Sequence, residues 1–416
     1  MVGQPTLQIV NLITGLLLLR WMSIEHYAQF GVAFAFQSTV CMLADVGLSS
    51  SILALAGARA KDPEVIGKYV RSARHFRMIV VCIVGVVFAI LFPWITAAQP
   101  WSAVTKLSIL ASILCAVVVQ GWAMYQAPLL GHRLIARVYQ PQIAAGTLRL
   151  GLSVLLHATN TLTGVAASWL GTFALGISGW WIKRHAVALV KEPEKSDPAA
   201  NKEMLRYLAP FILGVAFTAF QSQITIAIIT IFGTSQSIAE VAALGRLGQI
   251  FGILQAFNGV IIAPYVASLA FPLFRRRYFQ ILVLTILVAT LISALAFRFP
   301  GLLLWLLGPN YQGLGKCIGW TVCGSCICYV GGVMWTMHSA KKWVFWRANA
   351  LYIVATILTQ IVALQFVEIN TTGGIVFFGL WTAIAGMASH TSAAVLGFRS
   401  MRKPELSTSQ INKNIN

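Results

Sequence analysis

Three ionisable side chains lie deep inside apolar segments of this chain, where a charge is poorly tolerated. They are Asp45, Arg149 and Arg246. A charged side chain at the centre of a membrane helix costs roughly 2.5–3.5 kcal/mol, so each should face protein or water rather than lipid. A guanidinium in such a place can bind an anion, a phosphate above all, through paired charge-assisted hydrogen bonds. The two arginines are therefore candidate anion ligands.

The depth of each arginine gives two interpretations. Arg149 lies about fifteen residues into its predicted helix, ~22 Å from the inner boundary at 1.5 Å per residue. It is either an anion-binding group in a central cavity or an interhelical partner for Asp45 or for backbone carbonyls. Arg246 lies about eight residues, or ~12 Å, into its helix from the outer side. It either lines the outer mouth of the same cavity or reaches back to the surface.

Asp45 and Arg20 complete the set of candidate cavity residues. Asp45 lies in the inner part of its helix, where it is either a proton or cation site or a counter-ion that holds an arginine in place. Arg20 ends the first predicted helix, and Glu25 and His26 follow in a short outer loop. Arg20 is either a gate or ligand residue or an interfacial anchor.

The sequence contains no catalytic constellation. It has no GxxxxGK[ST] phosphate loop, no HExxH and no GxSxG, and its seven histidines are scattered. Cys323 and Cys326 form a CxxC without a nearby histidine or carboxylate, which favours packing over a metal or redox pair. We therefore expect that the protein is not an enzyme and that it needs no cofactor. A coupling ion, H+ or Na+, could bind at Asp45.

The elements that must position these residues are membrane helices. The chain is 58% hydrophobic and 10% charged, with a mean hydropathy of +0.79, so a bilayer must be its solvent. Twelve segments approach the ~20 residues that a span requires. They are Pro5–Leu19, Phe30–Gly57, Met78–Ala97, Leu107–Leu130, Leu134–His157, Leu162–Ile182, Tyr207–Phe232, Ile238–Leu269, Phe279–Phe297, Cys317–Ser339, Trp343–Phe366 and Gly374–Phe398.

Positive charge alternates strongly between the gaps that separate these segments. Of the thirty Lys and Arg residues, twenty-four fall in every second gap or in the C-terminal tail, and four fall in the alternate gaps. Because cytoplasmic loops retain positive charge, both termini should be cytoplasmic in a bacterial inner membrane. The net charge of +19 thus reflects topology and contact with anionic membrane lipids, and no nucleic acid is expected. No cleavable signal is expected either, since Met1 to Pro5 carries no Lys or Arg.

The longest polar stretch divides the chain into two sets of six helices. It extends from Lys183 to Arg206 and contains two Pro and several charges, as a solvated linker does. We expect an N-terminal bundle at 1–190, a linker at 191–203, a C-terminal bundle at 204–398 and a cytoplasmic tail at 399–416. Paired bundles of this kind are common among transporters. The outer loops are short, so they hold no separate catalytic domain.

Four segments carry a family resemblance. Residues 20–30, RWMSIEHYAQF, resemble the "R-x-L-S-x-x-x-Y-G-x-F" entry to the second helix of the polysaccharide-biosynthesis flippases, with Ala28 in place of the usual Gly. These Wzx-like flippases belong to the multidrug/oligosaccharidyl-lipid/polysaccharide exporter superfamily. Residues 43–50, LADVGLSS, resemble its "L-x-D-x-G-L". Residues 241–264 are similar to its eighth helix, and 304–311, LWLLGPNY, resemble its "L-x-x-L-F-G-x-x-Y".

The resemblance implies both a fold and a cargo. It implies two six-helix bundles in a V around a cationic cavity, which moves an undecaprenyl-pyrophosphate-linked oligosaccharide across the inner membrane. Such units feed O-antigen, capsule or exopolysaccharide synthesis, and a glycan polymerase and export machinery are implied partners. Arg20, Asp45 and Arg246 match recurrent charges of the family, whereas Arg149 rests on its depth alone.

Other functions remain open. One alternative is a cation-coupled multidrug exporter of the same superfamily, which would need carboxylates in its cavity, and Asp45 is the only deep one. Another is a membrane glycan polymerase or ligase, which usually carries a large outer loop with catalytic Arg or His. A third is a scaffold or lipid scramblase.

Overall fold

The computed structural model describes residues 3–195, 197–341, 343 and 345–413, and this part is helical throughout, without strands. Helical residues make up 88% of it. The first half contains α1 (Gly3–Trp21), α2 (Ile24–Asp45), α3 (Leu48–Ala56), α4 (Pro63–Ile95), α5 (Ala103–Val119), α6 (Gln126–Gly131), α7 (Ile135–Ala158) and α8 (Gly164–Ala186). The second half contains α9 (Pro198–Gln221), α10 (Ile224–Phe232), α11 (Ser235–Ser268), α12 (Phe271–Arg298), α13 (Pro300–Leu307), α14 (Gly315–Ala340), α15 (Trp346–Phe366) and α16 (Thr372–Lys413). The expected all-α membrane fold is confirmed.

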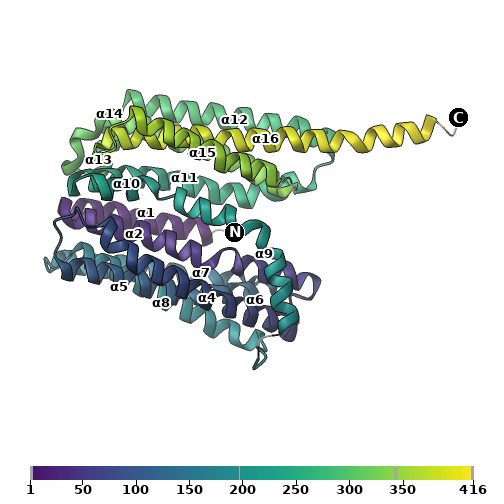
Figure 1. Cartoon of the computed structure of the whole chain (residues 1–416), viewed down its shortest axis with the longest axis horizontal. Coiled ribbons are helices and arrows are strands. Elements are labelled where there is room, and N and C mark those ends of the chain that lie inside the picture. Colours follow the sequence, from purple (N-terminus) through teal and green to yellow (C-terminus); the bar gives the residue numbers. More distant parts are fainter. Residues whose placement is uncertain (1–2, 196, 342, 344, 414–416) are drawn as a thin grey trace.

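The helices form two layers (Figure 1). One layer, the N-lobe, contains α1 to α8, and the other, the C-lobe, contains α10 to α16. Helices α1 and α2 of the N-lobe pack on α11, which is the C-lobe helix nearest to them. The layers lie close together at the end that holds α13 and separate toward the end that holds the N-terminus (Figure 1). We call the end with most of the Lys and Arg residues the basic end, and the other the opposite end.

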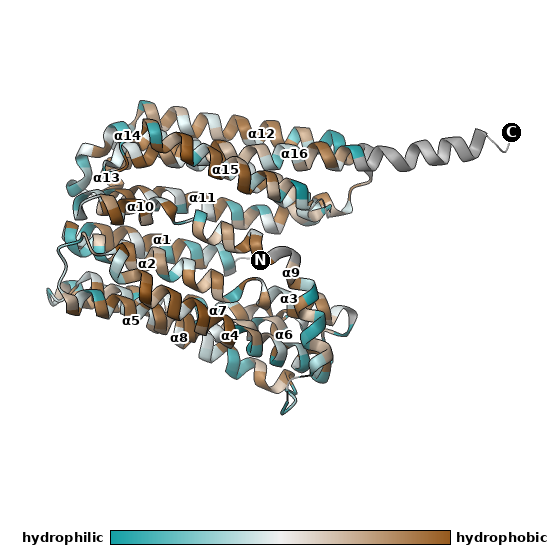
Figure 2. Ribbon diagram, in the orientation of Figure 1, coloured by the Kyte–Doolittle hydropathy of each residue, from teal (hydrophilic) through white to brown (hydrophobic). Residues whose placement is uncertain are grey.

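Each of the twelve expected spans corresponds to a helix or to consecutive helices. In the described residues, nine spans are long and apolar enough to cross a membrane, and the bent helix α9 makes a tenth. Helices α1 and α7 are absent from this set because polar residues, such as Asn11 and Arg149, interrupt their apolar character. Figure 2 shows the hydrophobic residues along the helices and hydrophilic ones gathered near α3, α6 and α9. The chain is a multi-pass membrane protein.

Helix α4 begins fifteen residues before the expected start at Met78. The Asp62 carboxylate accepts hydrogen bonds from the backbone N–H groups of Glu64 and Val65, and Pro63 occupies the first turn, which is a strong start signal. The apolar pattern marks only the lipid-facing part of a helix, so the polar extension was missed. As a result Arg77 lies inside a helix and not in a connection.

The second expected span breaks in two at Val46 and Gly47. Both residues have positive φ angles, 39° and 80°. Glycine adopts this conformation readily, whereas a β-branched residue does so at a cost, so the break is held by its surroundings. Ser49 lies in the first turn of α3, and its hydroxyl donates to the Asp45 carboxylate across the break. The LADVGL segment is therefore a helix–turn–helix junction.

The connection between the lobes is docked on the N-lobe. Lys68 of α4 pairs with Asp197 at 2.5 Å, and Arg74 pairs with Glu192 at 2.9 Å. The Lys68 ammonium and the backbone N–H of Ala199 hold the pKa of Asp197 below its usual range. The expected solvated linker is thus an ordered segment that is paired with α4.

Helix α9 spans both lobes. Its parts Pro198–Ala209 and Ile212–Gln221 meet at 56°. Met204 and Leu208 in the first part belong to the apolar core of the N-lobe, whereas Gln221 at the end accepts a hydrogen bond of 2.9 Å from Gln360 of α15. The bend thus lies between the part of α9 that packs in the N-lobe and the part that contacts the C-lobe.

Candidate functional site

Arg149 lines a cavity of about 180 Å³ that is formed by N-lobe helices alone. Helices α1, α5, α6, α7 and α8 contribute, together with the short 3-10 segment Gln120–Tyr125. Polar residues on five of these elements line the cavity: Asn11, Gln120, Gln126, Gln142 and Ser178. None of the residues that line it carries a carboxylate. The cavity is therefore polar, and its single charge is positive.

The guanidinium of Arg149 has few partners. Its Nε atom is buried and makes no hydrogen bond, and its Cζ atom lies 5.9 Å from the centre of the Phe30 ring. Arg149 forms no ion pair with any residue that the structure describes. A Cβ on Gly171 would lie 3.8 Å from the guanidinium, so this glycine leaves room beside it. Buried polar atoms are almost always satisfied, so the unbonded Nε of Arg149 is a donor that a ligand in the cavity could satisfy.

Arg246 reaches the same aromatic ring from the other lobe. It is 5% exposed, and its Nε donates to the Tyr27 hydroxyl at 3.0 Å. Its Cζ lies 5.3 Å from the centre of the Phe30 ring and 4.7 Å from that of Phe34. Two guanidinium groups, one from each lobe, thus contact Phe30, and cation–π attraction offsets part of their mutual repulsion. Arg246 is packed by protein here and is not among the residues that line the Arg149 cavity. The sequence left two positions open for Arg246, the outer mouth of that cavity or the surface.

Arg20 links the lobes at the opposite end. The guanidinium donates to the backbone carbonyls of Trp305 and Leu306 of α13 and lies 4.9 Å from the centre of the Trp305 ring. The side chain is exposed, so it makes this contact at the molecular surface. Of the two interpretations of Arg20, this position fits a gate residue, since the contact joins α1 of one lobe to α13 of the other.

Asp45 is paired with Arg77 in the basic half of the N-lobe. The Arg77 Nη1 atom lies 3.6 Å from the carboxylate, and its Nη2 donates to the Val117 carbonyl at 3.1 Å. Arg77 is 3% exposed. Asp45 therefore acts as counter-ion to an arginine, although not to Arg149, and sequence reasoning missed Arg77 because the start of α4 was placed too late.

Neutral polar residues of the N-lobe also bond across the lobe interface. The Gln99 amide, 3% exposed, donates to the carbonyls of Thr230 and Gly233, at 2.8 and 3.1 Å. The Trp101 indole donates to the Ser235 hydroxyl at 3.3 Å. These bonds and the Arg20 contact lie at the opposite end, so the lobes are joined there. Gln99 lies in a short connection and gives no signal in the sequence.

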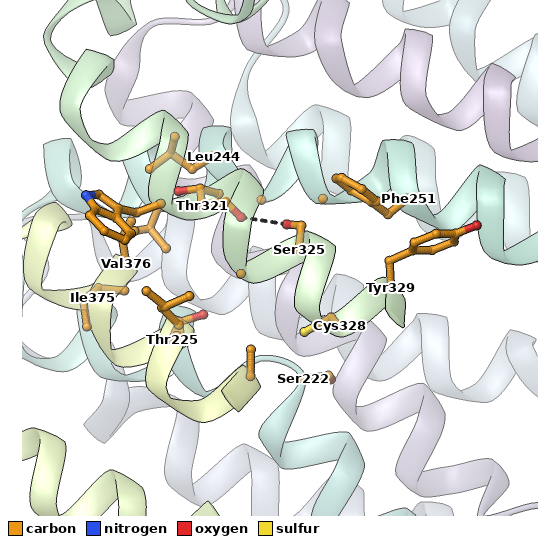
Figure 3. A pocket seen from close by; sticks show the side chains of 18 of the residues that line it. Ser222, Thr225, Leu244, Phe251, Thr321, Ser325, Cys328, Tyr329, Ile375 and Val376 are labelled. Atoms are coloured by element: carbon orange, nitrogen blue, oxygen red, sulfur yellow. Dashed lines mark hydrogen bonds between the residues drawn. The ribbon is translucent and has the colours of Figure 1, made fainter. Parts of the chain in front are cut away.

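The C-lobe contains a second cavity of about 460 Å³ between α10, α11, α14 and α16 (Figure 3). Figure 3 shows Thr321, Ser325, Phe251 and Tyr329 around it, and no charged residue lines it. The C-lobe cavity is therefore neutral, whereas the N-lobe cavity is cationic. Each of these two cavities is lined by residues of one lobe.

The fold and the site together define a two-lobed membrane protein with an unpaired cation in one lobe and polar contacts that join the lobes at one end. No family model matches the sequence, and no curated protein matches it. Solved structures match it over nearly its whole length. An inward-facing multidrug resistance MATE family transporter of the MOP superfamily covers 98% of this chain and 96% of its own, with a TM-score of 0.66 and 14% identity.

The lipid II flippase MurJ, in an inward closed conformation, is similar too. It has a TM-score of 0.69 and 13% identity, over 93% of this chain and 84% of its own. The outward-facing MATE transporter of the MOP superfamily has a lower TM-score, 0.58, with 14% identity over 98% of this chain and 95% of its own. The chain therefore has the fold of these MATE and MurJ structures.

The Asp45–Arg77 pair gives a test of stability. Asp45→Asn leaves the buried Arg77 guanidinium without its carboxylate, so we expect the free energy of unfolding to fall by about 1–3 kcal/mol. Asp45→Asn/Arg77→Met should recover part of the loss, since both charges are then gone. Melting temperatures in detergent measure this. The exposed Glu64–Lys191 pair is the control, because Glu64→Gln should change little. An Asp45→Asn protein as stable as the parent would contradict the assignment.

Proposed function

We propose that this protein moves an undecaprenyl-pyrophosphate-linked oligosaccharide across the bacterial inner membrane, for O-antigen, capsule or exopolysaccharide synthesis. The observation that supports this most is Arg149, whose buried Nε has no hydrogen bond, in a polar cavity without carboxylates. Such a group can replace the water around a pyrophosphate with charge-assisted hydrogen bonds. The similarity in fold to a lipid II flippase is consistent with a cargo of this class.

In the proposed orientation the basic end is cytoplasmic, as the distribution of Lys and Arg indicates. Both termini are then cytoplasmic, and the contacts of Arg20 and Gln99 close the outer side. We propose residues 1–190 and 204–398 as the two bodies, with 191–203 as their linker and 399–416 as a tail. Met204 and Leu208, at the start of the second body, pack in the apolar core of the first. The cargo would enter from the cytoplasmic side, where the layers separate.

The proposed mechanism is alternating access. The pyrophosphate binds at Arg149 while the polyprenyl tail stays in lipid, and the outer contacts then break as the lobes rock. Movement of Arg246 away from Tyr27 would bring a second guanidinium to the cargo. With the cell interior negative, outward movement of an anion is favourable by ~2.3 kcal/mol per charge per 100 mV. Asp45 is the candidate site for a coupling H+ or Na+, since its side chain is 31% exposed.

A cation-coupled multidrug exporter is the second candidate, favoured by the similarity in fold to MATE transporters. An exporter of organic cations needs a carboxylate in its cavity. The residues that line the two cavities offer none, and the deep carboxylate of Asp45 is paired with Arg77. The charge of the cavity therefore favours an anionic cargo.

Two measurements separate these candidates. In cells that lack the gene, we expect the lipid-linked glycan to accumulate on the inner leaflet and surface glycan to fall at least tenfold. In proteoliposomes, the purified protein should flip a pyrophosphate-linked glycan lipid and should not move ethidium along a proton or sodium gradient. Cation efflux without glycan-lipid movement would overturn the proposal. A glycan polymerase or an export protein that copurifies with this chain would identify the partner that the family resemblance implies.

A further inference from the structure

A groove of about 550 Å³ runs along the C-lobe between α12, α14 and α16, apart from both cavities. Its lining is mostly apolar and includes Phe279, Leu282, Ile286, Met334 and Phe398. Several of these side chains are open to the surroundings, with Phe279 50% and Ile286 45% exposed. In a membrane-embedded lobe, such a groove faces acyl chains.

Two arginines line the groove at its basic end. They are Arg275 on α12 and Arg399 on α16. Both side chains are exposed, and neither makes an ion pair with a described residue. Arg275, Phe279, Leu282 and Ile286 recur at three- or four-residue spacing, so they share one face of α12. From Arg275 to Ile286 this face is ~16 Å long at 1.5 Å per residue.

We propose that this groove binds an anionic phospholipid. The phosphate lies between the guanidinium groups of Arg275 and Arg399, and an acyl chain follows the apolar face toward Ile286. Guanidinium groups are suited to this because they bind phosphate oxygens in pairs. The apolar part from Phe279 to Ile286 is ~10 Å long at 1.5 Å per residue, so it holds the upper part of an acyl chain. Anionic lipids are concentrated on the cytoplasmic leaflet. A neutral lipid would fill the apolar part but leave the two cations without a partner.

The site does not depend on the proposed cargo. It lies on the C-lobe alone, whereas Arg149 lies in the N-lobe cavity. Loss of lipid binding at the groove would leave the proposal for Arg149 unaffected. Failure of the proposal for Arg149 would likewise leave the lipid site unaffected.

Native mass spectrometry of the purified full chain tests the proposal. With equal amounts of tetraoleoyl cardiolipin and dioleoyl phosphatidylcholine added, we expect cardiolipin adducts to exceed phosphatidylcholine adducts. Arg275→Gln/Arg399→Gln should reduce the cardiolipin adducts at least fivefold. Arg276→Gln/Arg137→Gln removes the same charge from two exposed residues outside the groove and should leave the adducts unchanged. Equal loss in the two double variants would overturn the proposal.

The apolar part of the groove is tested separately. Ile286→Trp fills the groove and should lower cardiolipin binding while the melting temperature without added lipid stays unchanged. Soluble glycerol 3-phosphate should not displace cardiolipin, since it lacks the acyl chain. Displacement at equal concentration would overturn the proposed lipid site, because it would identify a headgroup site only. Retention of undecaprenyl phosphate in place of cardiolipin would also overturn it, because the groove would then hold the carrier of the cargo.

Discussion

Arg149→Ala is expected to reduce export of the glycan lipid by about 10–100-fold. A hydrogen bond to a charged group contributes about 1.5–3 kcal/mol, and about 1.4 kcal/mol corresponds to a factor of ten. Arg149→Lys keeps the charge but loses the planar pair of donors, so we expect an intermediate defect of about tenfold. Flipping of a fluorescent pyrophosphate-linked glycan in proteoliposomes measures both.

The stability of the same variants separates a ligand-binding arginine from a structural one. Arg149 has an orphaned Nε and no ion pair with a described residue, so its removal should leave the melting temperature unchanged or raise it. A structural arginine would instead lower it. Arg137 is the matched control, since it lies on the same helix and is exposed. Full export by both Arg149 variants would refute the role of Arg149, as would a defect of the same size in Arg137→Ala.

Gly31→Leu is expected to stop transport by preventing closure of the outer side. Gly31 of α2 faces Ala242 of α11 across the lobe interface, and a Cβ on Gly31 would lie 2.7 Å from the Ala242 Cβ. Real Cβ atoms essentially never approach so closely. A leucine therefore fits only if the lobes move apart, which favours the outward-open arrangement. We expect the transport rate to fall at least tenfold.

A distance between the lobes tests this explanation directly. Spin labels at Lys106 in the N-lobe and Lys316 in the C-lobe should lie farther apart in Gly31→Leu than in the parent. Ala242→Leu introduces bulk from the other side of the contact and should have the same effect. The control is Gly151→Leu on α7, where a Cβ would meet nothing within 4 Å. An unchanged label distance in both interface variants, with normal transport, would show that closure does not require this contact.

Both predictions concern the same movement from opposite sides. In the proposed mechanism, Arg149 belongs to the cavity that the cargo enters while the outer side is closed, and Gly31 belongs to the contact that closes the outer side. Between them, the Phe30 ring contacts both Arg149 and Arg246. Opening of the outer side would separate Arg246 from Tyr27 and would change the charge that surrounds Phe30. In the proposed mechanism, the two guanidinium groups would then contact the same cargo in different conformations.

Much of the fold follows from the sequence because membrane insertion depends on local composition. An apolar segment of about twenty residues is a helix regardless of its neighbours, since no other structure satisfies its backbone in lipid. All twelve expected spans are present as helices for this reason. The errors lie where hydropathy carries no signal, at the polar start of α4 at Pro63 and at the turn formed by Val46 and Gly47. At these positions, capping and backbone geometry decide where a helix begins or breaks.

The candidate site was predictable only in part. The sequence by itself determined that Asp45, Arg149 and Arg246 must avoid lipid, because the transfer energy of a charge depends on its depth alone. Only the tertiary structure decided their partners. Asp45 pairs with Arg77, thirty-two positions away, and Arg246 bonds Tyr27 from the other half of the chain. Hydrogen bonds and ion pairs act over a few ångströms, so they depend on which helices pack together. A single sequence does not give the distances between residues that are far apart in the chain.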